Sequence, residues 1–285
     1  MSSASEQAVA NARAIAFDRV KRRLKPYALF PFLGVLVFFM AYPIFMVVYA
    51  SFKGGPPGAD APFSLDGYTR AWSDWTTLKA LIVTLGLAAL RVPLGVFLAV
   101  MLAWSLTRTN TPLRGFFEQV LWLKIFLPAL PMLVAWMLLL SGKGSIINAF
   151  LMDSFHLTKP PLNIQSYWGI VFLTFIGMGA YLYMYMAPAF RNMDASLEES
   201  SRVSGASTLT TLRRITVPVL MPAILGVSLL SLLFALCSYE TELFLLAPKG
   251  VYVFTTWIWW RAAQFPPDYP GAMALSTVFL LFVTA

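Results

Sequence analysis

The sequence predicts an all-α protein, a polytopic bundle of transmembrane helices, and three observations lead to this class. Of the 285 residues, 59% are hydrophobic and only 12% are charged, whereas roughly a quarter are charged in soluble domains. The mean hydropathy is +0.71. Several apolar runs reach the roughly 20 residues that a helix needs to cross a bilayer core. Helices are expected because they satisfy their backbone polar groups internally in hydrocarbon.

Six apolar runs are separated by loops rich in glycine and proline, and we interpret each run as one membrane span. The runs cover residues 29–52, 78–106, 117–140, 167–190, 217–239 and 271–285. A basic N-terminal segment, residues 1–26, precedes a transmembrane domain at 27–285. The sixth run is shorter than a full span, so we expect the chain to be truncated there and to be the first part of a longer one.

The positions of the basic residues predict which loops face the cytoplasm. Six of the 21 Lys and Arg residues lie in segment 1–26, and four lie in the loop 191–217. An inside N-terminus places twelve of them on the inner side and seven on the outer side, which is the bias of cytoplasmic loops. The N-terminal segment is then either a surface-lying helix or a flexible leader. A formal charge of +8 would suggest nucleic acid as the partner of a soluble protein, but these charges gather beside the membrane and no nucleic acid is expected.

The loop 191–217 is a polar island between two apolar runs. Asp194 and Ser196 are suitable helix N-caps, and Glu199 follows Ser196 at the spacing of a capping box. Gly205 can take the left-handed conformation that ends a helix. We therefore expect a short helix that ends in a tight turn.

A second helical pattern begins at Ser207 and runs toward Pro218, which suits the first turn of the next span. Two short helices joined by a tight turn are shaped to lie in a groove of a partner protein. The alternative is a capped surface hairpin without a partner.

The polar island also carries a motif. Glu199-Ser200-Ser201, then Gly205 after three residues, and Ile215 and Val217-Pro218 further on resemble the EAA loop of binding-protein-dependent ABC importer permeases. The family has alanines in place of the two serines. The resemblance implies that this loop docks onto an ATP-binding subunit and transmits its closure. The candidate coupling residues are Glu198, Glu199, Ser200, Ser201, Arg202, Gly205, Ala206, Ile215 and Pro218.

The resemblance also implies an assembly and a location. The expected partners are two ATP-binding subunits that carry ATP and Mg, a second permease half or subunit, an extracytoplasmic solute-binding protein, and the lipid of a bacterial cytoplasmic (inner) membrane. Segments 63–68, 108–114, 144–148 and 167–170 are similar to permeases for ferric iron, polyamines, thiamine and phosphonates. Ferric iron is the leading expectation, and permeases of that branch are commonly one long chain of two halves.

The sequence contains no motif for nucleotide binding, catalysis or metal binding. It has no phosphate-binding Gly-x4-Gly-Lys-Ser/Thr loop, a single histidine, His156, and a single cysteine, Cys237. No catalytic set, metal site or cofactor is therefore expected on this chain. The competing classes are an ion-coupled secondary transporter, which predicts duplicated halves and broken spans, and an intramembrane enzyme, which lacks an acid, base or metal set.

Charged residues in the apolar runs are the candidates for a translocation path, because a charge in hydrocarbon faces the bundle interior or water. Arg91 lies in the middle of the second run; it either lines the path or pairs structurally. Lys124 is interpreted as a snorkelling or helix-pairing residue. At the outer end of the fifth run, Tyr239, Glu240 and Glu242 either offer oxygen ligands to an arriving cation or form an interfacial charge pair.

Overall fold

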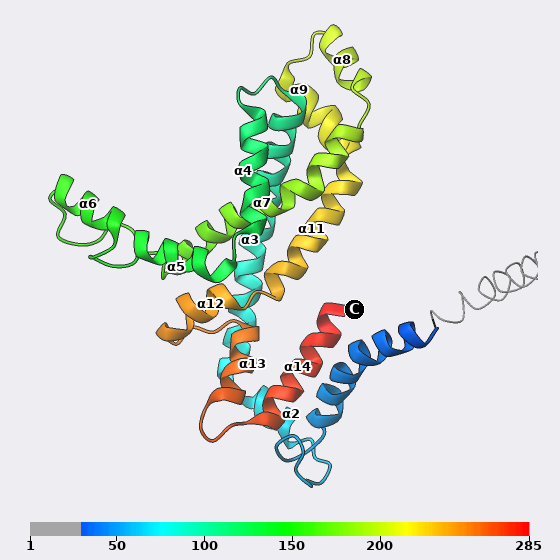
Figure 1. Cartoon of the computed structure of the whole chain (residues 1–285), viewed down its shortest axis with the longest axis vertical. Coiled ribbons are helices and arrows are strands. Elements are labelled where there is room, and N and C mark those ends of the chain that lie inside the picture. Colours follow the sequence, from blue (N-terminus) through cyan, green and yellow to red (C-terminus); the bar gives the residue numbers. More distant parts are fainter. Residues whose placement is uncertain (1–29, 285) are drawn as a thin grey trace, which may run out of the picture. The chain divides into compact units, whose positions relative to one another are not determined.

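The computed structural model describes residues 30–284 (Figure 1). The basic segment 1–26 therefore lies outside the described residues. The chain divides into two compact units, one with residues 30–69 and 268–280 and the other with 70–267 and 281–284. Within the described residues all regular elements are helical, and the only strand-like feature is an isolated bridge between Lys53 and Phe63. The predicted all-α class is confirmed.

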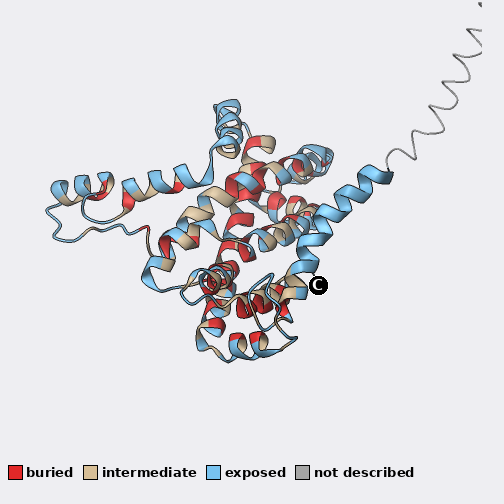
Figure 2. Ribbon diagram, turned by 60° about the horizontal axis from the view of Figure 1, so that its bottom comes forward, coloured by how far each residue is buried: buried red, intermediate tan, exposed pale blue. Residues whose placement is uncertain are grey.

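The smaller unit contains the helix Phe30–Ser51, the first part of α2 (Asp66–Ser73) and most of α14 (Tyr269–Thr284). Gly67 permits the close approach of α2 and α14, because a Cβ at this position would stand 2.7 Å from the carbonyl oxygen of Pro270. The helix Phe30–Ser51 is exposed along most of its length (Figure 2), as expected for a helix that lipid or another chain covers.

The larger unit is built on three packed helices, α3 (Trp75–Arg108), α7 (Tyr167–Asn192) and α11 (Met221–Leu236). Small buried residues along α3, including Ala99 and Ala103, let the helices approach closely, as is usual between membrane helices. The core between them also contains Tyr183 and Phe190 of α7. Both α3 and α7 are long and apolar enough to cross a membrane.

Two of the six predicted spans are broken. Helices α4 (Arg114–Phe126) and α5 (Ala129–Leu140) meet at 108°, and the segment Thr208–Val219 meets α11 at 73°. Within the described residues three helices meet the criteria for a span, or five if each bent pair counts as one, and α14 is shorter. The six predicted runs did not include these breaks. Prolines stand at both breaks and permit them, because Pro128 and Pro131, and Pro218 and Pro222, supply no backbone N–H there.

Helix α13 (Phe254–Ala263) packs on the first half of α3 through polar contacts. The indole Nε1 of Trp257 donates to the Thr77 hydroxyl at 3.0 Å. Arg261 Nη2 donates to Asp74 Oδ2 at 2.9 Å. These contacts fix α13 against the start of α3. Helices α6 (Ile146–Ser154) and α12 (Glu240–Leu245) complete the larger unit together with the elements of the loop described below.

Candidate coupling loop and buried ion pair

The first arm of the loop is α8 (Ser196–Val203), and its start differs from the prediction. The Ser196 N–H donates to the Asp194 carboxylate at 3.0 Å, and this bond holds the pKa of Asp194 below its ordinary value. The residue at the N-cap position is Ala195, which has helical dihedral angles. The predicted Ser196–Glu199 capping box is therefore wrong, because Ser196 already lies inside the helix and cannot cap it.

Gly205 ends the first arm as predicted, with φ of +84°. The Gly205 N–H donates to the Arg202 carbonyl at 2.9 Å, and the Ala206 N–H donates to the Ser201 carbonyl at 3.1 Å. This pair of bonds is a Schellman motif, in which the residue in the left-handed conformation is usually glycine. A rigid turn thus connects the two arms of the loop.

The second arm begins at Ser207, as predicted, where the Ser207 hydroxyl accepts a hydrogen bond from the Thr210 N–H at 3.3 Å. It continues through α9 (Thr208–Thr211), a π-helical turn η1 (Leu212–Thr216) and α10 (Val217–Val219). Pro218 lies in α10, before the bend at Leu220. It was predicted in the first turn of the next span, but the long helix of that span, α11, begins after the bend. Ile215 is half-buried in η1.

Glu198 joins the two arms from the inside of the loop. Its side chain is buried, its Oε1 accepts a hydrogen bond from the Thr216 hydroxyl at 2.6 Å, and its Oε2 lies 3.9 Å from Arg108 Nη1. Arg108, at the end of α3, also donates to the carbonyl groups of Phe190 and Met193, at the end of α7. This network ties the loop to the ends of both packed helices. From the sequence, Arg108 was noted only as an inner basic residue and as part of the segment 108–114, and this role was missed.

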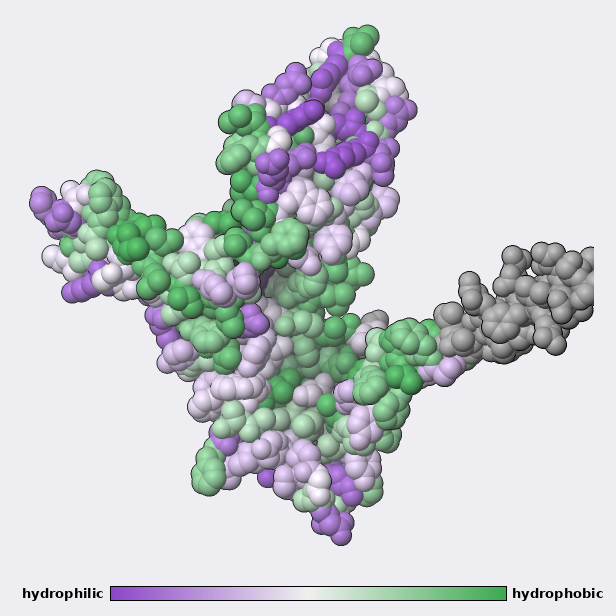
Figure 3. Space-filling model, in the orientation of Figure 1, coloured by the Kyte–Doolittle hydropathy of each residue, from purple (hydrophilic) through white to green (hydrophobic). Residues whose placement is uncertain are grey.

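The outer surface of the loop exposes apolar side chains among polar ones. Val203 is 90% exposed and Leu209 is 72% exposed, whereas Glu199 is exposed next to the buried Glu198. Figure 3 shows that this end of the larger unit is mostly hydrophilic, with hydrophobic residues at its tip. Exposed apolar residues rimmed by polar ones mark protein interaction sites. Ser200, Ser201 and Arg202 lie between Glu199 and Val203 on α8.

The structure brings two of the predicted path residues together. Arg91, midway along α3, and Glu242, on α12, form an ion pair with 2.5 Å between Arg91 Nη1 and Glu242 Oε1. Both side chains are 1% exposed. The Ser238 hydroxyl donates to the Glu242 carboxylate at 2.7 Å and 2.8 Å. A charge this deep persists because it is paired and hydrogen-bonded.

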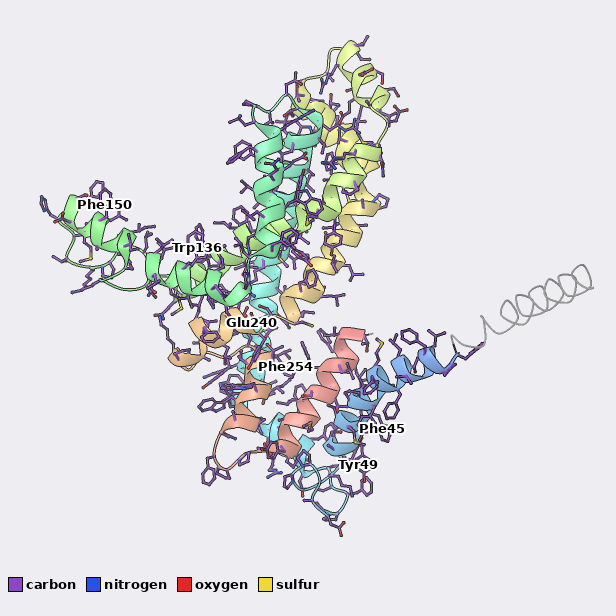
Figure 4. All side chains as sticks on the ribbon, viewed as in Figure 1. Phe45, Tyr49, Trp136, Phe150, Glu240 and Phe254 are labelled. Atoms are coloured by element: carbon purple, nitrogen blue, oxygen red, sulfur yellow. The ribbon has the colours of Figure 1, made fainter. Side chains whose placement is uncertain are left out.

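The other two predicted path residues lie apart from this pair. Tyr239 is the half-buried N-cap residue of α12, and Glu240 is exposed in the first turn of that helix (Figure 4). Arg91 and Ser238 both bond to the Glu242 carboxylate, which favours the alternative of a structural charge pair for Glu242, with Arg91 as its partner. The cation site at Glu240 and Glu242 stays a prediction.

Long apolar helices, broken spans and a rigid polar loop with an apolar tip define a membrane transport component. The chain belongs to the family of binding-protein-dependent transport system inner membrane components, whose pattern matches residues 91–285. Members of this family are the permease components of importers in which the ATPase is a separate chain.

Two relatives illustrate the range of the family. The polygalacturonan/rhamnogalacturonan transport system permease protein of Bacillus subtilis (strain 168) is 26% identical over 217 residues, which is 74% of this chain and 68% of the relative. An inner membrane ABC transporter permease protein of Escherichia coli (strain K12) is 25% identical over 275 residues, which is 91% of each chain. These relatives do not support the ferric-iron branch.

Solved structures share the fold. A bacterial alginate ABC transporter in complex with alginate pentasaccharide-bound periplasmic protein has a chain that matches with a TM-score of 0.74 and 19% identity over 94% of both chains. A bacterial ABC transporter involved in the import of the acidic polysaccharide alginate matches with a TM-score of 0.66 and 17% identity over 93% of this chain and 94% of that one.

Proposed function

We propose that this chain is the permease subunit of an ATP-driven importer that moves an oligosaccharide into a bacterial cell. Family membership supports the class, and the names of the Bacillus subtilis relative and of the two solved transporters support a carbohydrate as the substrate. The ferric-iron expectation has no such support and is set aside.

The observation that carries the mechanism is the loop between α7 and α11. Its apolar tip, Val203 of α8 and Leu209 of α9, is exposed on either side of a Schellman turn, and the Glu198–Thr216–Arg108 network connects its base to α3 and α7. A partner that binds this tip and moves would displace the helix ends with it. In our proposal this partner is one of two separate ATP-binding subunits, which supply ATP and Mg.

The remaining parts of the assembly follow from the same proposal. The chain lies in the bacterial cytoplasmic membrane with its N-terminus and the coupling loop inside, which agrees with the distribution of basic residues. A second permease subunit completes the path, and a periplasmic solute-binding protein delivers the substrate; the solved alginate transporter contains such a protein.

Broken spans are also found in ion-coupled secondary transporters, the alternative class, because these proteins use discontinuous helices. The described residues contain two such breaks. Family membership favours the ATP-driven class, because the family pattern matches most of the chain, residues 91–285.

Co-purification tests the proposal. We expect a tagged chain, expressed with its neighbouring transport subunits, to retain an ATPase subunit, and we expect Val203→Asp with Leu209→Asp to release it. Phe265→Asp is the matched control, because Phe265 is 98% exposed outside the loop. An ATPase subunit that stays bound to the loop variant would contradict the proposed docking surface.

A further inference from the structure

Arg91 has hydrogen-bonding capacity that its ion pair does not use. Nη1 faces Glu242, but the buried Nε and Nη2 atoms have no hydrogen-bond partner among the described residues. These two nitrogens lie on one edge of the guanidinium plane, and their N–H groups point in parallel. This edge binds both oxygens of a single carboxylate. Buried polar groups are rarely left unsatisfied in proteins, so the edge calls for an explanation.

Two cavities adjoin this residue. Arg91 lines a cavity of about 290 Å³ together with Thr174, Tyr181 and Ser238. A second cavity, of about 200 Å³, is also lined by Thr174 and Ser238. On its other walls the second cavity has Lys124 of α4, Thr241, and Trp136 of α5, which Figure 4 labels. The two cavities share Thr174 and Ser238 as lining residues, and together they form a region that lies against α3, α4, α5, α7, α11 and α12.

The charges around this region do not balance. Glu242 neutralises one cation, Arg91, but Lys124 is half-buried and has no ion pair or hydrogen bond with any of residues 30–284. Arg91 and Lys124 are the only charged residues that line the two cavities, and both are cations. A buried or half-buried cation that lacks an anionic partner is costly in an apolar environment.

The break between α4 and α5 adds to the positive potential. Ala129, the first residue of α5, lines the second cavity. The N-cap residue of this helix is Pro128, which supplies no side-chain acceptor for the free N–H groups of the first turn. Helix N-termini carry a partial positive charge and attract anions. The N-terminus of α5, Lys124 and the free edge of Arg91 thus all favour an anionic ligand.

We infer that these two cavities form a binding site for the carboxylate of an anionic sugar on its way through the membrane. The free edge of Arg91 binds the carboxylate, Lys124 and the N-terminus of α5 add positive charge, and the hydroxyl groups of Thr174 and Thr241 face the sugar. The rings of Trp136 and Tyr181 offer flat apolar faces to the sugar ring. The inference rests on the proposed function and adds to it the charge of the substrate and the residues that read this charge.

ATP-dependent uptake into proteoliposomes tests the inference, with the chain assembled with its ATP-binding subunits, second permease subunit and binding protein. The probes are trigalacturonate and its methyl ester, which lacks the carboxylate charges. Lys124→Gln is expected to raise the half-saturating concentration of trigalacturonate about tenfold and to leave that of the ester unchanged. The readout is the ratio of variant to wild type for each probe, because both proteins share the binding protein.

Three further variants complete the design. Lys143→Gln removes an exposed cation outside both cavities and should change neither probe. Lys124→Arg should restore most of the trigalacturonate uptake. Arg91→Lys keeps a cation for Glu242 but removes the bidentate edge, so it should also weaken trigalacturonate uptake selectively.

The outcomes separate this inference from the proposed function. If Lys124→Gln changes both probes equally, or neither, the carboxylate site is wrong while the importer remains. If the wild type transports only the ester, the carboxylate site is likewise wrong and the importer remains. If the wild type carries neither sugar, the proposed oligosaccharide importer fails and the site fails with it. A defect that appears in anionic lipid but not in pure phosphatidylcholine vesicles would assign the cations to a lipid headgroup and overturn the inference.

Discussion

The ion pair between Arg91 and Glu242 shows how a single residue can serve two purposes in a membrane helix. One side of the guanidinium compensates a buried carboxylate, and the other side has no hydrogen-bond partner among the described residues and is, in our proposal, the side that binds substrate. Removing one member of such a pair is expensive, because the partner is left buried and charged.

The first prediction concerns this pair. Glu242→Gln should destabilise the protein by about 3–5 kcal/mol, because it leaves Arg91 without a compensating charge. The measurement is the midpoint of thermal unfolding in detergent. Glu240→Gln is the control: Glu240 lies two residues away but is exposed, so its replacement should leave the midpoint nearly unchanged.

A double variant tests whether the midpoint falls because Arg91 is left without its partner or because the site tolerates no substitution. Arg91→Met with Glu242→Met removes both charges at similar volume, and such replacements are often neutral in stability. We expect it to recover most of the midpoint lost in Glu242→Gln. A double variant less stable than the single one would show that the pair itself, rather than the isolated charge, holds α12 to α3.

Glu198 and Glu199 illustrate what the sequence can and cannot resolve at this scale. The motif identified the segment, but neighbouring residues on a helix differ by about 100° in direction. Which of the two carboxylates is buried depends on how α8 sits on η1, and the distant partners Thr216 and Arg108 fix that arrangement. Likewise, no local pattern could pair Arg91 with a residue 151 positions away.

The second prediction tests the role of Glu198. Thr216→Val removes the only close hydrogen bond to the buried carboxylate among the described residues, so α8 should open more often. Hydrogen exchange of the amides in 196–206 should accelerate about tenfold or more, which corresponds to the loss of one bond to a charged group. Thr208→Val, at an exposed position in α9, should leave the exchange unchanged. Equal exchange in both variants would show that Arg108 alone fixes the buried carboxylate.

At the scale of elements, the turn at Gly205 depends on backbone conformation alone. Nothing lies within 4 Å of the position of its missing Cβ, so a side chain there meets no steric clash. The cost of a substitution arises from the positive φ, which side-chain-bearing residues reach at a penalty of roughly 1–2 kcal/mol.

The third prediction follows from this separation of causes. Gly205→Ala should destabilise the loop by about 1 kcal/mol, and Gly205→Asn by less, because asparagine tolerates the left-handed region. Retention of the ATPase subunit during purification should fall in the same order. Gly115→Ala is the matched control, since Gly115 also has open space but lies in a helix without a positive φ. Loss of the subunit in Gly115→Ala as well would remove the special role of the turn.

The helical elements themselves were largely predictable, since each apolar run contains a helix. The breaks were not predicted, although prolines stood at both. Pro93 and Pro188 show the reason, because both lie inside unbroken helices. A proline therefore permits a break without requiring one, and tertiary packing decides between a kink and a separation.

At the scale of the whole molecule, one continuous segment connects the coupling loop to the cavities. It runs from α9 through the bend at Leu220 into α11, whose Phe234 and Ala235 line the cavity beside Arg91. The orientation of α11 against the loop is set by the 73° bend. Under the proposed function, a movement of the loop would reach the substrate site through this bend, and the Arg108 network would transmit it to α3 and α7.

The last prediction tests this connection. Pro222→Ala supplies an N–H that can donate to the Pro218 carbonyl, which favours a straighter helix across the bend. The ATPase subunit should still bind, because the docking tip is unchanged, but the number of substrate molecules transported per ATP should fall about threefold to tenfold, in keeping with typical coupling energies. Pro248→Ala, at an exposed position in the short η2 helix (Ala247–Lys249), provides the control. A decline of transport and hydrolysis by the same factor in Pro222→Ala would indicate lost assembly, whereas wild-type rates of both would show that the loop acts through α3 and α7 without the bend.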